Sequence, residues 1–220
     1  MNVPNIRRSE APELAGHVIL AIDTSLGTSV ALGCDGQIVE VSSDDPRGHA
    51  EHIGTLIAAA FTEAGCAPSR VTGVVAGMGP GPFTGLRVGI AAAHAFAAGC
   101  GLHILPLVSH DAAALELLES GATSGVRIVQ DAKRRELFVT EYSSLDWAGL
   151  PVRSADPHLV PREGYESVVN EAWPERLPAG ALVRLAARRL AAGQPFEADR
   201  ALYLRLPDVS PPSAPKPVTP

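Results

Sequence analysis

An aspartate ends one apolar run of the chain and is followed at once by hydroxyl side chains and a glycine. The stretch reads Asp23-Thr-Ser-Leu-Gly-Thr28 and follows the run Val18 to Ile22. A carboxylate at a strand end suits magnesium, and the hydroxyls of Thr24 and Ser25 suit a nucleotide phosphate. The alternative, which we favour, is that Asp23 caps a hairpin through hydrogen bonds to nearby backbone, because a complete nucleotide site needs further loops.

A Gly/Pro-rich loop follows a second apolar run and opens into a helical pattern. It reads Gly77-Met-Gly-Pro-Gly-Pro-Phe-Thr-Gly-Leu-Arg-Val-Gly89. The backbone at Gly79 and Gly81 can turn tightly around a phosphate, but the loop lacks both the Gly-Lys-Ser/Thr ending of a P-loop and the G-x-G-x-x-G order. Arg87 lies one helical turn further on. It is either an exposed helix charge or a partner for a carboxylate or phosphate across an interface.

Two further groups of polar residues have chemical potential. His49, Glu51 and His52 suggest a metal site, but no third ligand has an obvious position and zinc needs three or four, so we predict no metal. Lys133-Arg-Arg135 is a basic turn that tRNA could contact, although such a turn is usually just solvated. No Ser-His-Asp arrangement follows from the spacing, and no catalytic residue is predicted.

Hydrophobic spacing predicts the elements that position these residues. A β-β-β-α-β-α-β order is followed by a similar second rhythm, which implies mixed sheets with helices packed on them. The expected strands cover residues 18–23, 29–33, 37–41, 71–76, 103–105, 126–130 and 136–142, with 202–206 extended. The expected helices cover residues 50–64, 84–98, 111–120 and 181–192.

The helix over 84–98 carries a stripe of small residues at spacings of four. They are Gly85, Gly89, Ala93 and Ala97. Such a stripe exposes nearly bare backbone and allows another element to approach closely. Two interpretations are open: the helix packs tightly on its own sheet, or it contacts a helix of another chain.

Length and composition bound the class of protein. The chain has 220 residues, 46% of them hydrophobic, and a formal net charge of −6, so no general field attracts nucleic acid. Cys34, Cys66 and Cys100 are far apart in the sequence, which favours buried thiols in a reducing, cytoplasmic compartment. We expect a flexible leader at 1–16, lobes at 17–108 and 109–209, and a disordered Pro-rich tail at 210–220.

Three motifs together resemble the TsaB (YeaZ) family, an accessory subunit in the biosynthesis of threonylcarbamoyladenosine in bacterial tRNA. They are Ile19-Leu-Ala-Ile-Asp-Thr-Ser25, His49-Ala-Glu-His-Ile53 and the glycine loop described above. The family normally has Ser where this chain has Pro82. Weaker similarity continues through Gln130-Asp-Ala-Lys-Arg-Arg-Glu-Leu137 and Leu202-Tyr-Leu-Arg205, whereas the segment from Gly164 to Leu182 looks short and divergent.

The resemblance implies an α/β protein with the actin-like ATPase (ribonuclease H-like) fold, in two lobes whose mixed sheets are flanked by helices. It also implies a non-catalytic scaffold that dimerises with a TsaD-type transferase, the enzyme that attaches threonylcarbamoyl to adenosine 37 of tRNAs reading ANN codons. A TsaE-type ATPase and a homodimer are the other expected partners. Contact with tRNA would be indirect, no membrane is involved, and ATP and magnesium would act at the level of the complex rather than as intrinsic cofactors.

Family members pair through the first two helices of the N-terminal lobe, which correspond here to 50–64 and 84–98. This raises the intermolecular interpretation of the stripe above the intramolecular one. The predicted interface residues are Ile53, Leu56, Ile57, Gly85, Leu86, Gly89, Ile90, Ala93 and Ala97. Two enzyme rivals stay open: an ATP-dependent transferase or kinase using Asp23 and the loop 77–81, and a glycoprotease-like hydrolase, for which the sequence offers no nucleophile or metal set.

Overall fold

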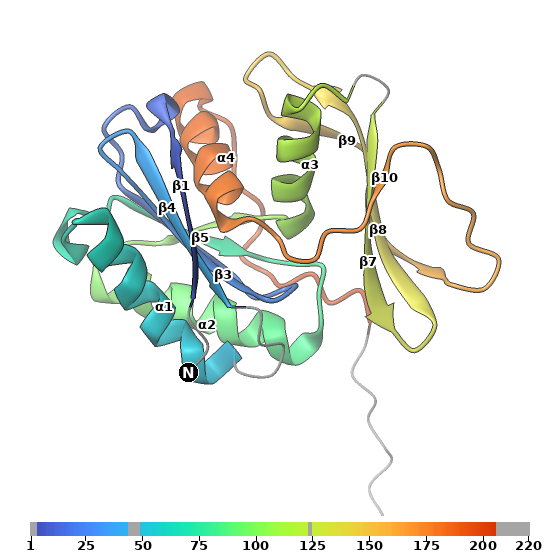
Figure 1. The fold of residues 1–220 in the computed structure, drawn as a ribbon, viewed down its shortest axis with the longest axis horizontal. Helices are drawn as coiled ribbons and strands as arrows, with labels where there is room; N and C mark the ends of the chain where they lie inside the picture. Colours follow the sequence, from blue (N-terminus) through green and yellow to red (C-terminus); the bar gives the residue numbers. More distant parts are fainter. Residues whose placement is uncertain (1–3, 44–48, 123–124, 206–220) are drawn as a thin grey trace, which may run out of the picture.

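A six-stranded mixed sheet forms the centre of the larger lobe (Figure 1). The computed structural model describes residues 4–43, 49–122 and 125–205. The strand order is β1-β4-β3-β2-β5-β6; the first four strands in this order pair antiparallel with one another, and β5 and β6 add in parallel beside β2. Their bounds are Asn5–Glu10, Ile19–Asp23, Thr28–Cys34, Gln37–Ser43, Gly73–Gly77 and Ile104–Leu107, in the order β1 to β6.

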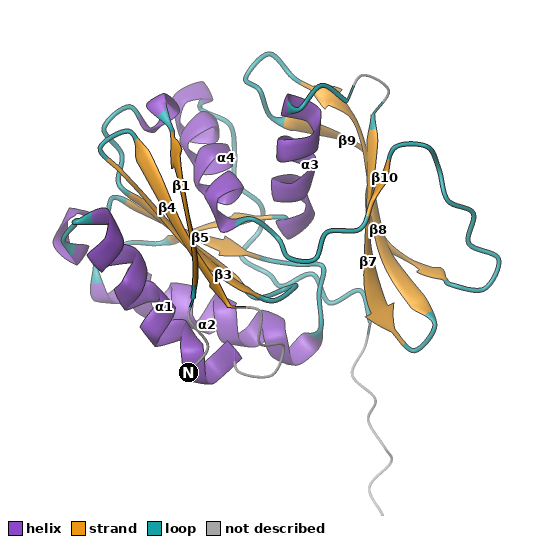
Figure 2. Ribbon diagram, viewed as in Figure 1, coloured by secondary structure: helices purple, strands orange, loops and turns teal. Residues whose placement is uncertain are grey.

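Helices cover both faces of this sheet (Figure 2). On one face lie α1 (His49–Ala64) and α2 (Phe83–Gly99), side by side, and α4 (Ala179–Ala192) covers the other face. Apolar residues at three-four spacing make α1 amphipathic, and the residue after its last turn is Gly65, whose positive φ of 60° suits glycine. Leu20 and Ile22 of β2, with Val18 just before the strand, lie in the core under α1 and α2, whereas Ile19 and Ala21 lie on the α4 side.

A second, four-stranded sheet forms the smaller lobe and runs in the order β10-β7-β8-β9. Its strands are β7 (Val126–Lys133), β8 (Glu136–Leu145), β9 (Pro151–Pro161) and β10 (Glu171–Ala172). The helix α3 (Ser109–Glu119) lies between this sheet and α4, so it joins the two lobes (Figure 1). Two short 3-10 helices, Pro12–Leu14 and Pro68–Arg70, complete the described elements.

Most expected elements are confirmed, and the prediction of an α/β chain with two mixed sheets flanked by helices is correct. Hydrophobic periodicity located β2, β3, β4 and the four helices to within about two residues. The strand β9 was not predicted, because Pro151, Pro157 and Pro161 interrupt its pattern. An edge strand tolerates prolines, since one row of its backbone groups has no partner in the sheet.

Two expectations about the organisation need correction. Residues 5–14, predicted as part of a flexible leader, form β1 and a 3-10 helix, with Ala11 and Leu14 buried. The helix α4, predicted within a C-terminal lobe at 109–209, packs against β2 and β3 of the first sheet. Residues 202–205 have no regular secondary structure, and the predicted tail at 210–220 lies outside the described residues.

Candidate functional site

The paired helices α1 and α2 contain the predicted interface residues, and most of these side chains point inward. Ile53 and Leu56 belong to the core beneath α1, and Leu86 is fully buried beneath α2. Only Ile57 and Ile90, among the residues named for the interface, are half-buried. The two helices contact each other through the stacked rings of Phe61 and Phe96, whose centroids are 5.5 Å apart.

The small-residue stripe of α2 faces its own chain. Gly85, Gly89, Ala93 and Ala97 are all buried. Thr24 Oγ1 donates to the carbonyl of Gly85 at 2.7 Å and accepts from the amide of Gly89 at 2.9 Å. A Cβ atom on Gly89 would lie 2.2 Å from that oxygen. The expectation that this stripe meets another chain is therefore corrected: its small size lets the Asp23–Thr24 loop approach the α2 backbone.

The opposite, solvent-facing side of the two helices is also made of small residues. Gly54, Ala58 and Thr62 of α1 are exposed, and so are Ala91 and Ala95 of α2. We call these five residues the outer face. Each set repeats every four residues and so forms a line along its helix. The charged side chains Glu51, Glu63 and Arg87 stand toward the helix ends, and exposed His94, between Ala91 and Ala95 in the sequence, pairs with Asp199 at 3.1 Å.

The Asp23 loop is closed inside the protein. Asp23, Thr24 and Ser25 each have at most 2% of their surface exposed. Asp23 Oδ1 accepts hydrogen bonds from the amide and the hydroxyl of Ser25, which is the hairpin-capping arrangement that we favoured from the sequence. The hydroxyls and the carboxylate proposed for a nucleotide are thus within the protein interior and already bonded to the chain.

The glycine loop packs directly on this hairpin. The Gly79 amide donates to Ser109 Oγ at 3.0 Å, so a donor suited to phosphate already has a partner. Gly81 is buried, and a Cβ atom there would lie 2.8 Å from the Cα atom of Ser25. Only glycine permits this contact between the loop and the hairpin. The loop and hairpin therefore come together as the sequence suggested, but as a packed contact.

Arg87 lies apart from that closed centre, at the start of α2. Its guanidinium stacks on the ring of Phe83 at 3.9 Å and donates to the Tyr203 hydroxyl at 3.4 Å. Phe83 in turn contacts Tyr203, with ring centroids 4.8 Å apart. Arg87 is therefore an exposed charge held by aromatic neighbours, close to the first of the two alternatives that its spacing left open.

A buried network of hydrogen-bonded side chains, which sequence reasoning missed, links the hairpin to the second sheet. Gln130 Nε2 donates to the carbonyl of Ser25 at 2.8 Å, and Gln130 Oε1 lies 3.2 Å from His110 Nε2. His110 Nδ1 lies 2.7 Å from Thr140 Oγ1. Burial lowers the pKa of His110 to about 4, so the imidazole is neutral at pH 7. A polar Gln in an otherwise apolar strand pattern was the available signal.

A second buried group joins α3 to β8 and β9. Asp111 Oδ1 accepts from the Tyr142 hydroxyl at 2.7 Å and from Arg153 Nε at 2.8 Å. Arg153 also reaches Glu197 at 2.9 Å, in the segment after α4. Asp111 is 2% exposed. This cluster is well suited to holding the two lobes in one arrangement, since each charge is paired and hydrogen-bonded.

Two further possibilities raised by the sequence are a metal site near His49 and contact between tRNA and the basic turn at 133–135. Within the described residues no group of three or more His, Cys, Asp or Glu side chains is placed to hold a metal ion, and the His49 side chain lies outside them. In the basic turn, Lys133 pairs with Asp131 at 3.3 Å. Nearby Arg205 pairs with Glu136, which neutralises a further part of this surface.

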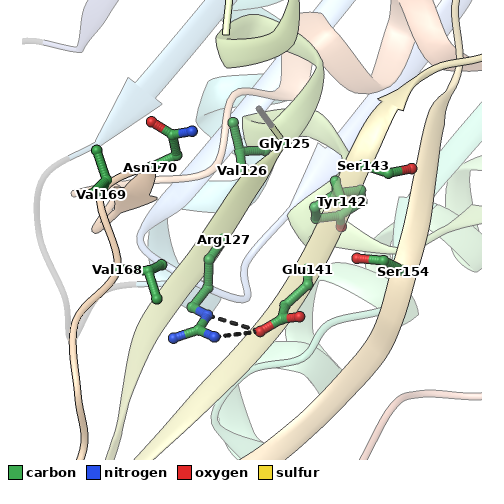
Figure 3. Close-up of a pocket in the computed structure, with 10 residues that line it drawn as sticks. All are labelled: Gly125, Val126, Arg127, Glu141, Tyr142, Ser143, Ser154, Val168, Val169 and Asn170. Atoms are coloured by element: carbon green, nitrogen blue, oxygen red, sulfur yellow. Dashed lines mark hydrogen bonds and ion pairs between the residues drawn. The ribbon is translucent and has the colours of Figure 1, made fainter. Parts of the chain in front are cut away.

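A hollow of about 670 Å³ lies on the second sheet, and none of its lining residues is among the site residues predicted from the sequence (Figure 3). Its floor carries Arg127 and Glu141, whose side chains point toward each other and are joined at 2.9 Å and 2.5 Å. Val168 and Val169 form one rim. Because the two charges satisfy each other, the hollow offers no net charge to a ligand.

Comparisons with known proteins found relatives in sequence and solved structures of similar fold. A family model described as TsaD, tRNA N6-adenosine threonylcarbamoyltransferase, matches residues 41–149. An uncharacterised protein of Mycobacterium tuberculosis is 36% identical over 132 residues, which cover 56% of this chain and 58% of that protein. The tRNA threonylcarbamoyladenosine biosynthesis protein TsaB of Escherichia coli is 31% identical over 125 residues, covering 56% and 54%.

The chain thus spans little more than half the length of these curated relatives. Among solved structures, a Pseudomonas aeruginosa protein described as uncharacterised with similarity to peptidase YeaZ superposes with a TM-score of 0.72 at 26% identity. That superposition covers 86% of this chain and all of the other. Separately, no helix among residues 4–43, 49–122 and 125–205 has the length and apolar character to cross a membrane.

Proposed function

We propose that this chain, which is similar to the TsaB protein of Escherichia coli and to YeaZ-like structures, acts in the biosynthesis of threonylcarbamoyladenosine in tRNA. Its fold is the actin-like, ribonuclease H-like fold that the sequence resemblance implied. In our proposal the chain is a non-catalytic scaffold and activator in the cytoplasm. Its partner is a TsaD-type transferase, which modifies adenosine 37 of tRNAs reading ANN codons.

One observation carries the proposal: the outer face is solvent-exposed, and its five residues are small and uncharged. Alanine and glycine at spacings of four allow a facing helix to come close, so that the two backbones pack with extensive van der Waals contact. Half-buried Ile57 and Val88 lie among these residues and supply apolar area. The outer face is therefore suited to a helix–helix contact with another chain.

The same face permits two partners. A second copy of the chain would pair isologously, each outer face against the other, and a transferase of similar fold would replace that copy. The two pairings would then compete, and the scaffold would bias the transferase toward one conformation through its differential binding. We further propose that a TsaE-type ATPase joins this complex, that ATP and magnesium act there, and that tRNA is met chiefly by the transferase.

The closed hairpin supports a scaffold rather than an ATP-dependent transferase or kinase. Asp23 and Thr24 are buried and bonded within the chain, so a nucleotide would have to separate the hairpin from α2 before reaching them. Isothermal titration of the isolated chain with Mg-ATP distinguishes the two functions. Micromolar binding would favour the enzyme, and the scaffold proposal expects no binding at millimolar nucleotide.

The direct experiment places one charge at the centre of the outer face. Ala91→Arg adds a guanidinium where a facing helix would desolvate it, whereas Ala191→Arg adds the same group to an exposed alanine of α4, on the other side of the sheet. Burying an unpaired charge costs several kcal/mol, so we expect pairing to weaken by about 100-fold or more in Ala91→Arg alone. Light scattering and titration against the transferase measure the two pairings.

Far-UV circular dichroism serves as the folding control for both variants. Wild-type pairing by a folded Ala91→Arg protein would show that the outer face is not the contact. The cellular readout is the nucleoside mass spectrum of tRNA from a host lacking this protein. We expect wild type and Ala191→Arg to restore threonylcarbamoyladenosine and Ala91→Arg to fail.

A further inference from the structure

Two cysteines that are far apart in the sequence touch in the core of the larger lobe. Cys34 is the last residue of β3, and Cys66 follows the glycine that ends α1. Their sulfur atoms are 2.8 Å apart, with Cys34 placed to donate its thiol hydrogen to Cys66. Both residues are about 95% buried and both are free thiols, whereas Cys100, just after α2, is exposed. Buried thiols were expected at all three positions, and Cys100 is the exception.

A surface ion pair fastens the same two segments together. Arg70 donates to both carboxylate oxygens of Asp35, at 2.7 Å and 2.9 Å. Asp35 directly follows Cys34, and Arg70 lies four residues after Cys66. The end of β3 and the chain beyond α1 are therefore held side by side from outside, which keeps the two sulfurs adjacent. A disulfide needs the sulfurs at about 2.0 Å, so closing the remaining gap takes a shift of less than about 1 Å.

We propose that Cys34 and Cys66 form an oxidative modification site, in which a small peroxide converts the two thiols into one reversible disulfide. A small oxidant is required because the sulfurs are almost fully buried and a bulky disulfide reagent cannot reach them in the closed fold. Burial raises the pKa of the Cys34 thiol to about 12, so reaction is slow and proceeds through transient opening around the pair.

The chemistry balances in two steps. The thiolate of Cys66 attacks one peroxide oxygen, the O–O bond breaks, and the products are a sulfenic acid on Cys66 and one water after protonation. The sulfur of Cys34 then attacks the sulfenic sulfur, the S–O bond breaks, and a second water leaves with the Cys34 proton. Two protein thiols lose two electrons in total, and hydrogen peroxide accepts them.

The disulfide would join the end of a central strand to the end of α1. It closes a loop of 32 residues, the separation between the two cysteines. Closing a loop of this length removes conformational entropy from the unfolded chain. The oxidised protein is therefore expected to melt roughly 5–10 °C above the reduced protein.

The test uses hydrogen peroxide on the full chain carrying Cys100→Ala, which removes the exposed thiol. After catalase quenching, the protein is denatured with iodoacetamide and analysed by mass spectrometry, with and without dithiothreitol. We expect both remaining thiols to escape alkylation, a peptide linking Cys34 to Cys66, full reversal by dithiothreitol, and the rise in melting temperature. The matched control, Cys34→Ala with Cys100→Ala, should show no linked peptide and no rise.

Three results would overturn the proposal. One is full alkylation of both thiols after peroxide treatment, which would mean that the pair stays reduced. Another is oxygen addition to either sulfur without a linked peptide. An equal rise in melting temperature in the Cys34→Ala control would equally exclude the disulfide as its cause. The primary measurement uses a chain whose core cysteines are intact, so misfolding of the control leaves it interpretable.

Discussion

Exchanging a glycine for alanine within a helix should have opposite effects at two positions of this protein. In α1, Gly54 is exposed, and a Cβ atom there would meet nothing within 4 Å. Alanine should stabilise that helix by about 0.5–1 kcal/mol, because the unfolded glycine loses more backbone freedom on folding. In α2, the same exchange at Gly89 meets the hydroxyl of Thr24.

The magnitude at Gly89 follows from the contact. The new methyl would stand 2.2 Å from Thr24 Oγ1, so the hairpin or the helix must move. Overpacking costs about 1–3 kcal/mol, and losing the bond between that hydroxyl and the buried Gly89 amide costs a further 1–3 kcal/mol or so. The helix-propensity gain of about 1 kcal/mol offsets part of this, which leaves a net loss of roughly 1–5 kcal/mol.

Urea unfolding followed by far-UV circular dichroism measures both changes in one series. The midpoint should rise for Gly54→Ala and fall for Gly89→Ala relative to wild type. A third variant, Thr24→Ser, keeps the hydroxyl and removes the methyl. Combined with Gly89→Ala it should recover part of the loss, because the smaller side chain can shift. If Gly89→Ala were as stable as wild type, the inward orientation of the α2 stripe would be refuted.

Two further outcomes test the buried polar groups. Arg153→Met should cost about 3 kcal/mol of unfolding free energy, since Asp111 is left buried with the Tyr142 hydroxyl and a long 3.9 Å contact to Arg189. Arg8→Met in an exposed pair with Glu63 should cost at most about 1 kcal/mol; equal losses would contradict the buried role. The folded-state pKa of His110 lies near 4, below its unfolded value of about 6.5, so its contribution is complete above pH 6.5 and is lost as pH falls toward 4. Stability of His110→Gln should decline less over that interval than stability of wild type, and parallel declines would show that other groups titrate.

The sequence predicted the larger lobe well because its patterns are local. Alternation and apolar runs identified β2, β3 and β4, and three-four spacing identified α1 and α2. The same patterns could not say which side of α2 faces inward, since small residues occur on both of its sides. Only the position of Thr24, distant in sequence from Gly89, decides the orientation.

The missed features depend on contacts between distant segments. Pairing of the two cysteines needs the end of β3 beside the end of α1, which no spacing rule gives. The network of Gln130 and His110 could be recognised only once β7 was known to meet both α3 and the Asp23 hairpin. The helix α4 was located correctly, but its choice of the first sheet over the second is a tertiary fact: a Cβ atom on Gly33 would lie 2.6 Å from Val183, so β3 leaves room for this helix.

The strand β1 covers one of the two edges of the six-stranded sheet. It pairs along the whole length of β4, from Asn5 opposite Ser42 to Glu10 opposite Gln37. All six of its side chains are exposed, and two of them are arginines. A short, charged strand therefore forms the outer edge of the sheet. Its backbone pairs with amides and carbonyls of the apolar strand β4 that would otherwise have no partner. Removing β1 would uncover a template for edge-to-edge pairing between copies, so solubility of the folded chain depends on a segment that contributes almost nothing to its core.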